Sequence, residues 1–163
     1  MIYDEAKVEA LYQKTLDEAR RLLASLAVAE GRTPNTKVLN GWVYEQVIRY
    51  CLCEELKKLR ITPIIQEQVP LHGRAKIDLL VGNVAIEIKA LGSFGDDAKK
   101  YYYYQNRVEE KGWVYFYITR SESYKPYRSS IETALGKEHV FFLDTDSDWK
   151  RFIDEIAKNM RQR

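Results

Sequence analysis

Two short apolar runs joined by a two-residue turn constrain the fold of this chain more than any other feature. The runs cover residues 75–81 and 84–90, and Gly82-Asn83 lies between them. Glycine and asparagine accept the positive φ that tight hairpin turns require. The pattern therefore predicts an antiparallel hairpin in which Val81 faces Val84.

This register places Asp78 directly across from Glu87, and Lys76 across from Lys89. Opposed residues share one face of the hairpin, with Cβ atoms about 4.5–5.5 Å apart. Two carboxylates at that distance repel each other unless a cation lies between them. A divalent cation with oxygen ligands, most naturally Mg²⁺, satisfies such a pair. The alternative is a solvent-exposed strand face on which Lys76 and Lys89 offset the two acids.

The rest of the sequence predicts helices on both faces of a mixed sheet, an α/β class of fold. Residues 3–30 contain no glycine or proline and predict a long helix that ends at Gly31. The full expected order is α-α-β-β-β-α-β-α-β-α. Besides the hairpin and that helix, it comprises helices over 36–59, 96–111, 129–135 and 147–160 and strands over 62–71, 113–119 and 140–143.

The first helix has no clear place in this layered arrangement. We therefore expect residues 1–33 to form an N-terminal helical arm and residues 34–163 to form the main domain. The arm carries more leucine than the small sheet can cover, which favours a homodimer in which the arm is the contact. These leucines are Leu11, Leu16, Leu22, Leu23 and Leu26.

Composition narrows the class of protein. The chain has 163 residues, of which 45% are hydrophobic and 31% charged, so one domain with a real core is expected. The net charge of +2 permits nucleic-acid binding without requiring it. No apolar stretch is long enough to span a membrane. Cys51 and Cys53 should lie on one helix and point apart, which favours a reduced, intracellular protein of the cytoplasm.

A carboxylate also interrupts the apolar stripe of the second helix. Glu45 lies on the face that carries Gly41, Ile48 and Leu52. A buried carboxylate without a partner is costly. Glu45 therefore either pairs with a core lysine or arginine, or reaches over the sheet edge towards Asp78 and the strand after it. Gly41, one turn earlier, would let a backbone approach closely.

Asp78 followed by Glu87-Ile88-Lys89, with Glu45 on an upstream helix, resembles the PD-(D/E)XK nuclease superfamily, whose fold is restriction-endonuclease-like. The resemblance covers about residues 38–119. Within that superfamily, the segments 41–45 and 75–81 look like the small single-domain members, which include archaeal Holliday junction resolvases. One departure is Ile77, because the namesake motif has proline there.

The resemblance implies a metal-dependent DNA endonuclease that hydrolyses phosphodiester bonds with Mg²⁺ or Mn²⁺. Asp78, Glu87 and the backbone carbonyl of Ile88 would be metal ligands, and Glu45 would bind a second metal or a metal-bound water. Lys89 would orient the attacking water or stabilise charge on the phosphate. Carboxylates suit a hard cation, and an ammonium group beside them stabilises charge that develops in the transition state.

The helix after the Glu-Ile-Lys strand offers substrate contacts. Alignment with the superfamily places Lys99 and Tyr103 there, one turn apart on one face, and Gln105 is a competing candidate. Arg74 and Lys76 flank Asp78 and are expected to contact the DNA backbone. The alternative for this tyrosine-rich helix is ordinary amphipathic packing. Its inward stripe would then be Ala98, Tyr101, Gln105 and Val108.

Two other functions compete with the nuclease. The first is a DNA-binding module on the same fold with little or no turnover. The second is an assembly protein in which residues 3–30 form a coiled arm and the acids are vestigial. The complete Asp78, Glu87 and Lys89 set argues against the second of these functions.

Overall fold

A computed structural model describes residues 1–33, 37–90, 98–120, 128–143 and 148–162. Its strands follow the expected order along the chain and form a five-stranded sheet with the spatial order β1-β2-β3-β4-β5. The first three strands are antiparallel neighbours, whereas β3, β4 and β5 run parallel. The strands are β1 (Ile65–His72), β2 (Ala75–Val81), β3 (Val84–Lys89), β4 (Val114–Arg120) and β5 (Val140–Leu143).

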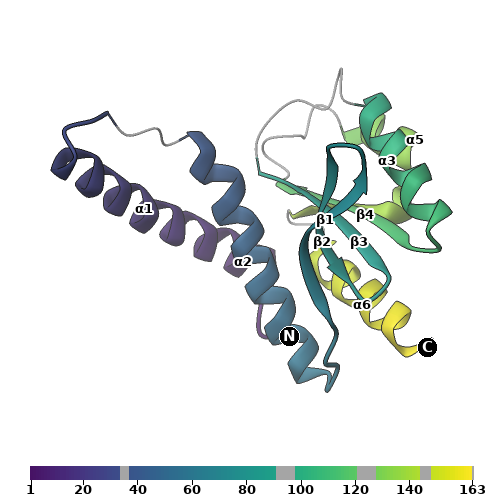
Figure 1. Cartoon of the computed structure of the whole chain (residues 1–163). Coiled ribbons are helices and arrows are strands. Elements are labelled where there is room, and N and C mark those ends of the chain that lie inside the picture. Colours follow the sequence, from purple (N-terminus) through teal and green to yellow (C-terminus); the bar gives the residue numbers. More distant parts are fainter. Residues whose placement is uncertain (34–36, 91–97, 121–127, 144–147, 163) are drawn as a thin grey trace.

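Helices cover both faces of the sheet, as the sequence predicted (Figure 1). One apolar core joins the sheet to α1, α2 and α6, and the other joins it to α3 and α5. The described residues therefore form an α+β fold with a mixed sheet. The helices are α1 (Glu5–Ala29), α2 (Lys37–Lys58), α3 (Ala98–Glu110), α5 (Arg128–Leu135) and α6 (Asp148–Arg161), with a short 3-10 turn at Lys137–His139.

The predicted hairpin is confirmed, but its ladder is short. Val81 pairs with Val84, and the regular pairing stops at Leu79 and Ile86, one pair before the expected Asp78–Glu87 pair. Beyond that point β2 stays paired with β1 and β3 stays paired with β4. The two strands therefore part at the residues that carry the candidate carboxylates.

Helix α1 differs between its two halves. In the N-terminal half, Val8, Tyr12 and Leu16 are buried in the core. Glu9 accepts three hydrogen bonds from the guanidinium of Arg120, which is buried at the end of β4. The C-terminal half carries the exposed Leu22 and Leu26 and extends beyond the sheet, and α2 lies antiparallel beside the helix (Figure 1). The domain boundary at residue 33 stays a prediction.

None of the described helices is long and apolar enough to cross a membrane. Both cysteines lie on α2 and are free thiols, as the sequence predicted. Gly41 does not have the close neighbour that we expected. Apart from its chain neighbours and the backbone of its own helix, no heavy atom of the described residues lies within 4 Å of the position a Cβ would take.

Candidate active site

Asp78 and Glu87 are both buried where β2 and β3 part. The amide of Ile88 donates a hydrogen bond of 2.8 Å to Oδ2 of Asp78. Gln68 on β1 donates to the other oxygen, Oδ1, across 3.4 Å. The strand alternation places Glu87 and Lys89 on the same face of β3. Two carboxylates thus lie in a region from which most water is excluded.

Lys89 neutralises part of this charge. Its Nζ lies 2.6 Å from Oε1 of Glu87, whose side chain is only 3% exposed. The same ammonium lies over the ring of Tyr101 on α3, 5.7 Å from the ring centre. Its charged form is stabilised because Glu87 and Asp78 raise the pKa of Lys89 against the opposing effect of burial. Lys89 is therefore a fixed cation at the carboxylate pair.

The carboxylates also perturb each other. Burial raises the pKa of Glu87, and the neighbouring Asp78 raises it further, although Lys89 and Lys100 oppose the shift. Burial likewise raises the pKa of Asp78, against the effect of Lys89 and the hydrogen bond from Ile88. Perturbed carboxyl groups of this kind are typical of sites that bind cations or move protons.

Glu45 joins the same electrostatic cluster from α2. Burial raises the pKa of Glu45 to about 7, and Asp78 contributes the next largest effect in the same direction. Glu87 raises this pKa as well, whereas Lys89 lowers it. The second of the two predicted positions for Glu45, over the sheet edge towards the carboxylates, agrees with this arrangement. No salt bridge to a core lysine or arginine is found for Glu45 among the described residues.

The carboxylate oxygens at this site provide only some of the ligands that a hard cation needs. Among the described residues, no group of three or more aspartate, glutamate, histidine or cysteine side chains could hold a metal ion. One oxygen of Glu87, Oε2, is nevertheless buried and lacks a hydrogen-bond partner within the same residues. Such an atom is costly unless a partner arrives. The cluster therefore has an unsatisfied oxygen of the type that Mg²⁺ prefers.

The expected substrate residues lie on two neighbouring surfaces. Arg74, Lys76 and Lys99 are exposed. Tyr103 is 39% exposed, and its hydroxyl accepts a hydrogen bond of 3.0 Å from Nε of Arg107. Its ring also lies near His72 at the end of β1. The exposed face of α3 and the β1–β2 hairpin therefore lie side by side.

Gln105 does not lie at the site. Its side chain is buried, and Nε2 donates a hydrogen bond of 2.8 Å to the carbonyl of Leu135 on α5. The predicted inward stripe of α3 is confirmed, because Tyr101, Gln105 and Val108 are the buried residues of this helix. Gln105 thus joins α3 to α5, and Lys99 and Tyr103 are the remaining candidates from the sequence.

Two residues near the carboxylates were not assigned a role from the sequence. Lys100 lowers the pKa of both Asp78 and Glu87 and lies over the rings of Tyr101 and Tyr104. The superfamily alignment favoured the neighbouring Lys99 instead. Gln68 is on an edge strand that no motif covers, so the sequence carried no signal for it.

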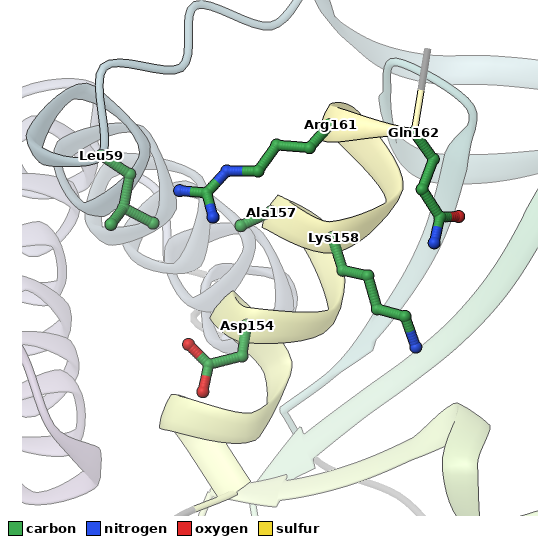
Figure 2. Close-up of a pocket in the computed structure, with 6 residues that line it drawn as sticks. All are labelled: Leu59, Asp154, Ala157, Lys158, Arg161 and Gln162. Carbon is green, nitrogen blue, oxygen red and sulfur yellow. The ribbon is translucent and has the colours of Figure 1, made fainter.

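Two cavities lie away from the carboxylates. One has a volume of about 370 Å³ and separates the end of α2 from α6; Figure 2 shows Arg161 extending from α6 towards Leu59. The other, of about 390 Å³, lies between α1 and α2 and is lined by residues such as Leu11 and Tyr50. Neither is lined by Asp78, Glu87 or Lys89.

Comparison with protein-family models, curated proteins and solved structures gave no match.

Proposed function

We propose that this chain is a metal-dependent DNA endonuclease of the PD-(D/E)XK type, with a restriction-endonuclease-like core. One observation carries the proposal. Asp78 and Glu87 are buried together at the point where β2 and β3 part, with Lys89 on the same strand face and one carboxylate oxygen of Glu87 left unsatisfied. A merely structural strand would gain nothing from burying two acids side by side.

Each group has a distinct part in the proposed reaction. Asp78, Glu87 and the carbonyl of Ile88 would hold Mg²⁺, and Glu45 would hold a second ion or a water. The metal, when bound, activates water and neutralises charge on the phosphate. The Lys89 ammonium is held at the carboxylates and is available to stabilise the charge that develops on the scissile phosphate.

The substrate would lie over α3 and the β1–β2 hairpin. Arg74, Lys76, Lys99 and Tyr103 present cations and a hydroxyl on these two neighbouring surfaces. Such groups contact the phosphate backbone and fix the position of the substrate without reading its sequence. We further propose that the protein acts as a homodimer, because a duplex presents two strands related by a two-fold axis.

The direct experiment is cleavage of plasmid, linear, branched and single-stranded DNA with Mg²⁺ or Mn²⁺. We expect Asp78→Asn and Glu87→Gln to abolish cleavage, because each removes charge that the cation needs. Both substitutions keep the side-chain shape. A matched control is Glu109→Gln, which removes an exposed carboxylate from α3 and should cleave at the wild-type rate.

Cleavage at the wild-type rate by both site variants would refute the proposal. So would calorimetry that shows unchanged Mg²⁺ affinity in both. Far-ultraviolet circular dichroism of each variant checks that the fold is retained. If only one variant loses activity, the ligand assignment of the other is wrong.

A second function, DNA binding with little or no turnover, is favoured by one specific feature. Lys89 lies against Glu87, and no complete three-ligand group exists among the described residues. A binding module would retain DNA in the presence of Mg²⁺ yet leave every substrate of the panel intact. Electrophoretic mobility shifts measured on the same DNA panel separate this function from the nuclease.

A further inference from the structure

Gln68 has a backbone conformation that is unusual for a strand. Its φ is +51°, in the left-handed region. In the described part of the chain, Arg60 is the other non-glycine residue with a positive φ, and it follows the end of α2, where this conformation is common. Within a strand the left-handed conformation costs on the order of 1–3 kcal/mol and persists only when surrounding contacts impose it.

The strained residue lies opposite Asp78. Glu67 pairs with Leu79 and Val69 pairs with Ile77, but the residue between them forms no pair in the ladder. Instead the Gln68 side chain reaches Oδ1 of Asp78. The strand thus gives up regular pairing at one position and gains a contact with a candidate metal ligand.

Glu67, the residue before Gln68, contacts α2, the helix that carries Glu45. The carboxylate of Glu67 accepts a hydrogen bond of 3.2 Å from Gln46 and lies 3.5 Å from Nε of Arg49, both on α2 and both close to Glu45 in sequence. On a regular strand, consecutive side chains point to opposite faces. The kink at Gln68 allows two consecutive residues to reach the helix that carries Glu45 and the strand that carries Asp78.

We propose that Gln68 is a positioning residue for Asp78, an inference that rests on the proposed function. Its amide holds Oδ1 of Asp78 while the Ile88 amide holds Oδ2, so the carboxylate is fixed from both sides. Groups that orient metal ligands commonly change metal affinity or activity about 10- to 100-fold when removed. The contacts of Gln68 with Asp78 and of Glu67 with α2 hold the strained backbone in place, and this backbone conformation directs the amide at Asp78.

Two substitutions at this position separate the amide from the backbone. Gln68→Ala and Gln68→Gly both remove the amide, but only glycine adopts a positive φ without strain. We expect both variants to bind Mg²⁺ at least about tenfold more weakly than the wild type in calorimetry. Without metal, Gln68→Gly should unfold at a higher temperature than the wild type, and Gln68→Ala should not.

Two controls complete the design. Gln66→Ala removes an exposed amide from the same strand, at a position that pairs regularly with Leu80, and should leave Mg²⁺ affinity unchanged. Arg60→Gly relieves a positive φ far from the carboxylates in sequence and should raise the unfolding temperature without changing Mg²⁺ affinity.

The outcomes distinguish this inference from the proposed function. If the wild type binds Mg²⁺, Asp78→Asn abolishes binding and both Gln68 variants bind like the wild type, the positioning role is refuted and the proposed function stands. If the wild type does not bind Mg²⁺ or Mn²⁺, the proposed function fails, and the positioning role fails with it. A Gln68→Gly variant that is less stable than the wild type refutes the strain argument.

Discussion

The backbone amide of Ile88 donates a hydrogen bond of 2.8 Å to a carboxylate oxygen of Asp78. A side chain thus takes the place of the strand carbonyl that would continue the β2–β3 ladder beyond Leu79 and Ile86. The two strands part, yet Asp78 remains attached to the strand that carries Glu87. We therefore attribute both the separation of the two strands and the position of Asp78 next to Glu87 to the hydrogen bond from Ile88 to Asp78.

Lys89 should be separable from metal binding. An ammonium cannot be a metal ligand, and here it lies against Oε1 of Glu87. We expect Lys89→Ala to keep Mg²⁺ affinity or to raise it, because a cation that competes for Glu87 is removed. Its single-turnover cleavage rate should fall by a factor on the order of 10² or more. Lys58→Ala, which removes an exposed lysine from the end of α2 and has no proposed part in substrate binding, is the matched control. An unchanged rate with altered affinity would show that Lys89 only offsets the acids.

Lys100 should matter more for DNA binding than Lys99. Lys99 and Lys100 are both exposed on α3, but it is the charge of Lys100 that lowers the pKa of Asp78 and of Glu87. We expect Lys100→Ala to weaken DNA binding in Ca²⁺ and to reduce the slope of log affinity against log salt by about 0.9, as for the loss of one duplex phosphate contact. Equal slopes for Lys100→Ala and the wild type, measured by fluorescence anisotropy, would exclude such a contact. Lys99→Ala should change the slope less.

Stability without metal should fall as the pH rises from about 5 to about 7.5, because the folded state holds carboxyl protons more tightly than the unfolded state. The pKa of Glu45 is raised to about 7, and an unfolded glutamate titrates near about 4.3. Protonated Glu45 therefore contributes its full stabilisation when the pH is below the pKa of an unfolded glutamate. This contribution to the free energy of unfolding is lost as the pH rises through the pKa of Glu45 in the folded protein. Thermal unfolding measured across this range, with Glu45→Gln as the variant that flattens the slope, checks the expectation.

Added Mg²⁺ should reverse that loss. Ligands must be deprotonated to bind a metal, so the stabilisation by Mg²⁺ should be larger at high pH than at low pH. The measurement is the difference in unfolding temperature with and without Mg²⁺. If this difference in unfolding temperature does not change with pH, the titrating carboxyl groups are not the groups that bind Mg²⁺.

A homodimer through α1 should depend on its exposed leucines. Leu22 and Leu26 are 62% and 49% exposed, whereas Leu16 is buried in the core of the chain itself. We expect sedimentation equilibrium to show a dimer that Leu22→Glu and Leu26→Glu dissociate into monomers with the far-ultraviolet circular dichroism of the wild type, and loss of the dimer should lower the unfolding temperature. Asn106→Glu, on the exposed face of α3, should leave the dimer intact. A wild-type protein that sediments only at 19.2 kDa would rule out the dimer.

The hairpin and its acids could be predicted because they depend on contacts close in sequence. The turn at Gly82-Asn83 sets the register, and strand alternation sets the faces of Glu87 and Lys89. The inward stripe of α3 follows from helical periodicity in the same way. These features need no knowledge of how distant elements meet.

Features that depend on distant elements escaped the sequence. The hydrogen bond from Gln105 to Leu135 requires α5 to lie against α3, which no local pattern shows. The premature end of the hairpin ladder is local, but strand alternation does not indicate it, because the Asp78 side chain rather than a strand carbonyl accepts the hydrogen bond from Ile88. The positive φ of Gln68 has no signal either, because glutamine has no preference for it.

The contact between α1 and Arg120 has a consequence for the order in which the chain folds. Glu9 and Arg120 are 111 positions apart, and Glu5 accepts a hydrogen bond from the amide of Trp149, 144 positions away. A ribosome therefore makes α1 long before it makes either partner. Until then Val8, Tyr12 and Leu16 have no complete core to enter, and contacts of such long range slow folding. The apolar face of α1 therefore stays exposed on the nascent chain until β4 and α6 are made, and exposed apolar surface of this kind favours aggregation.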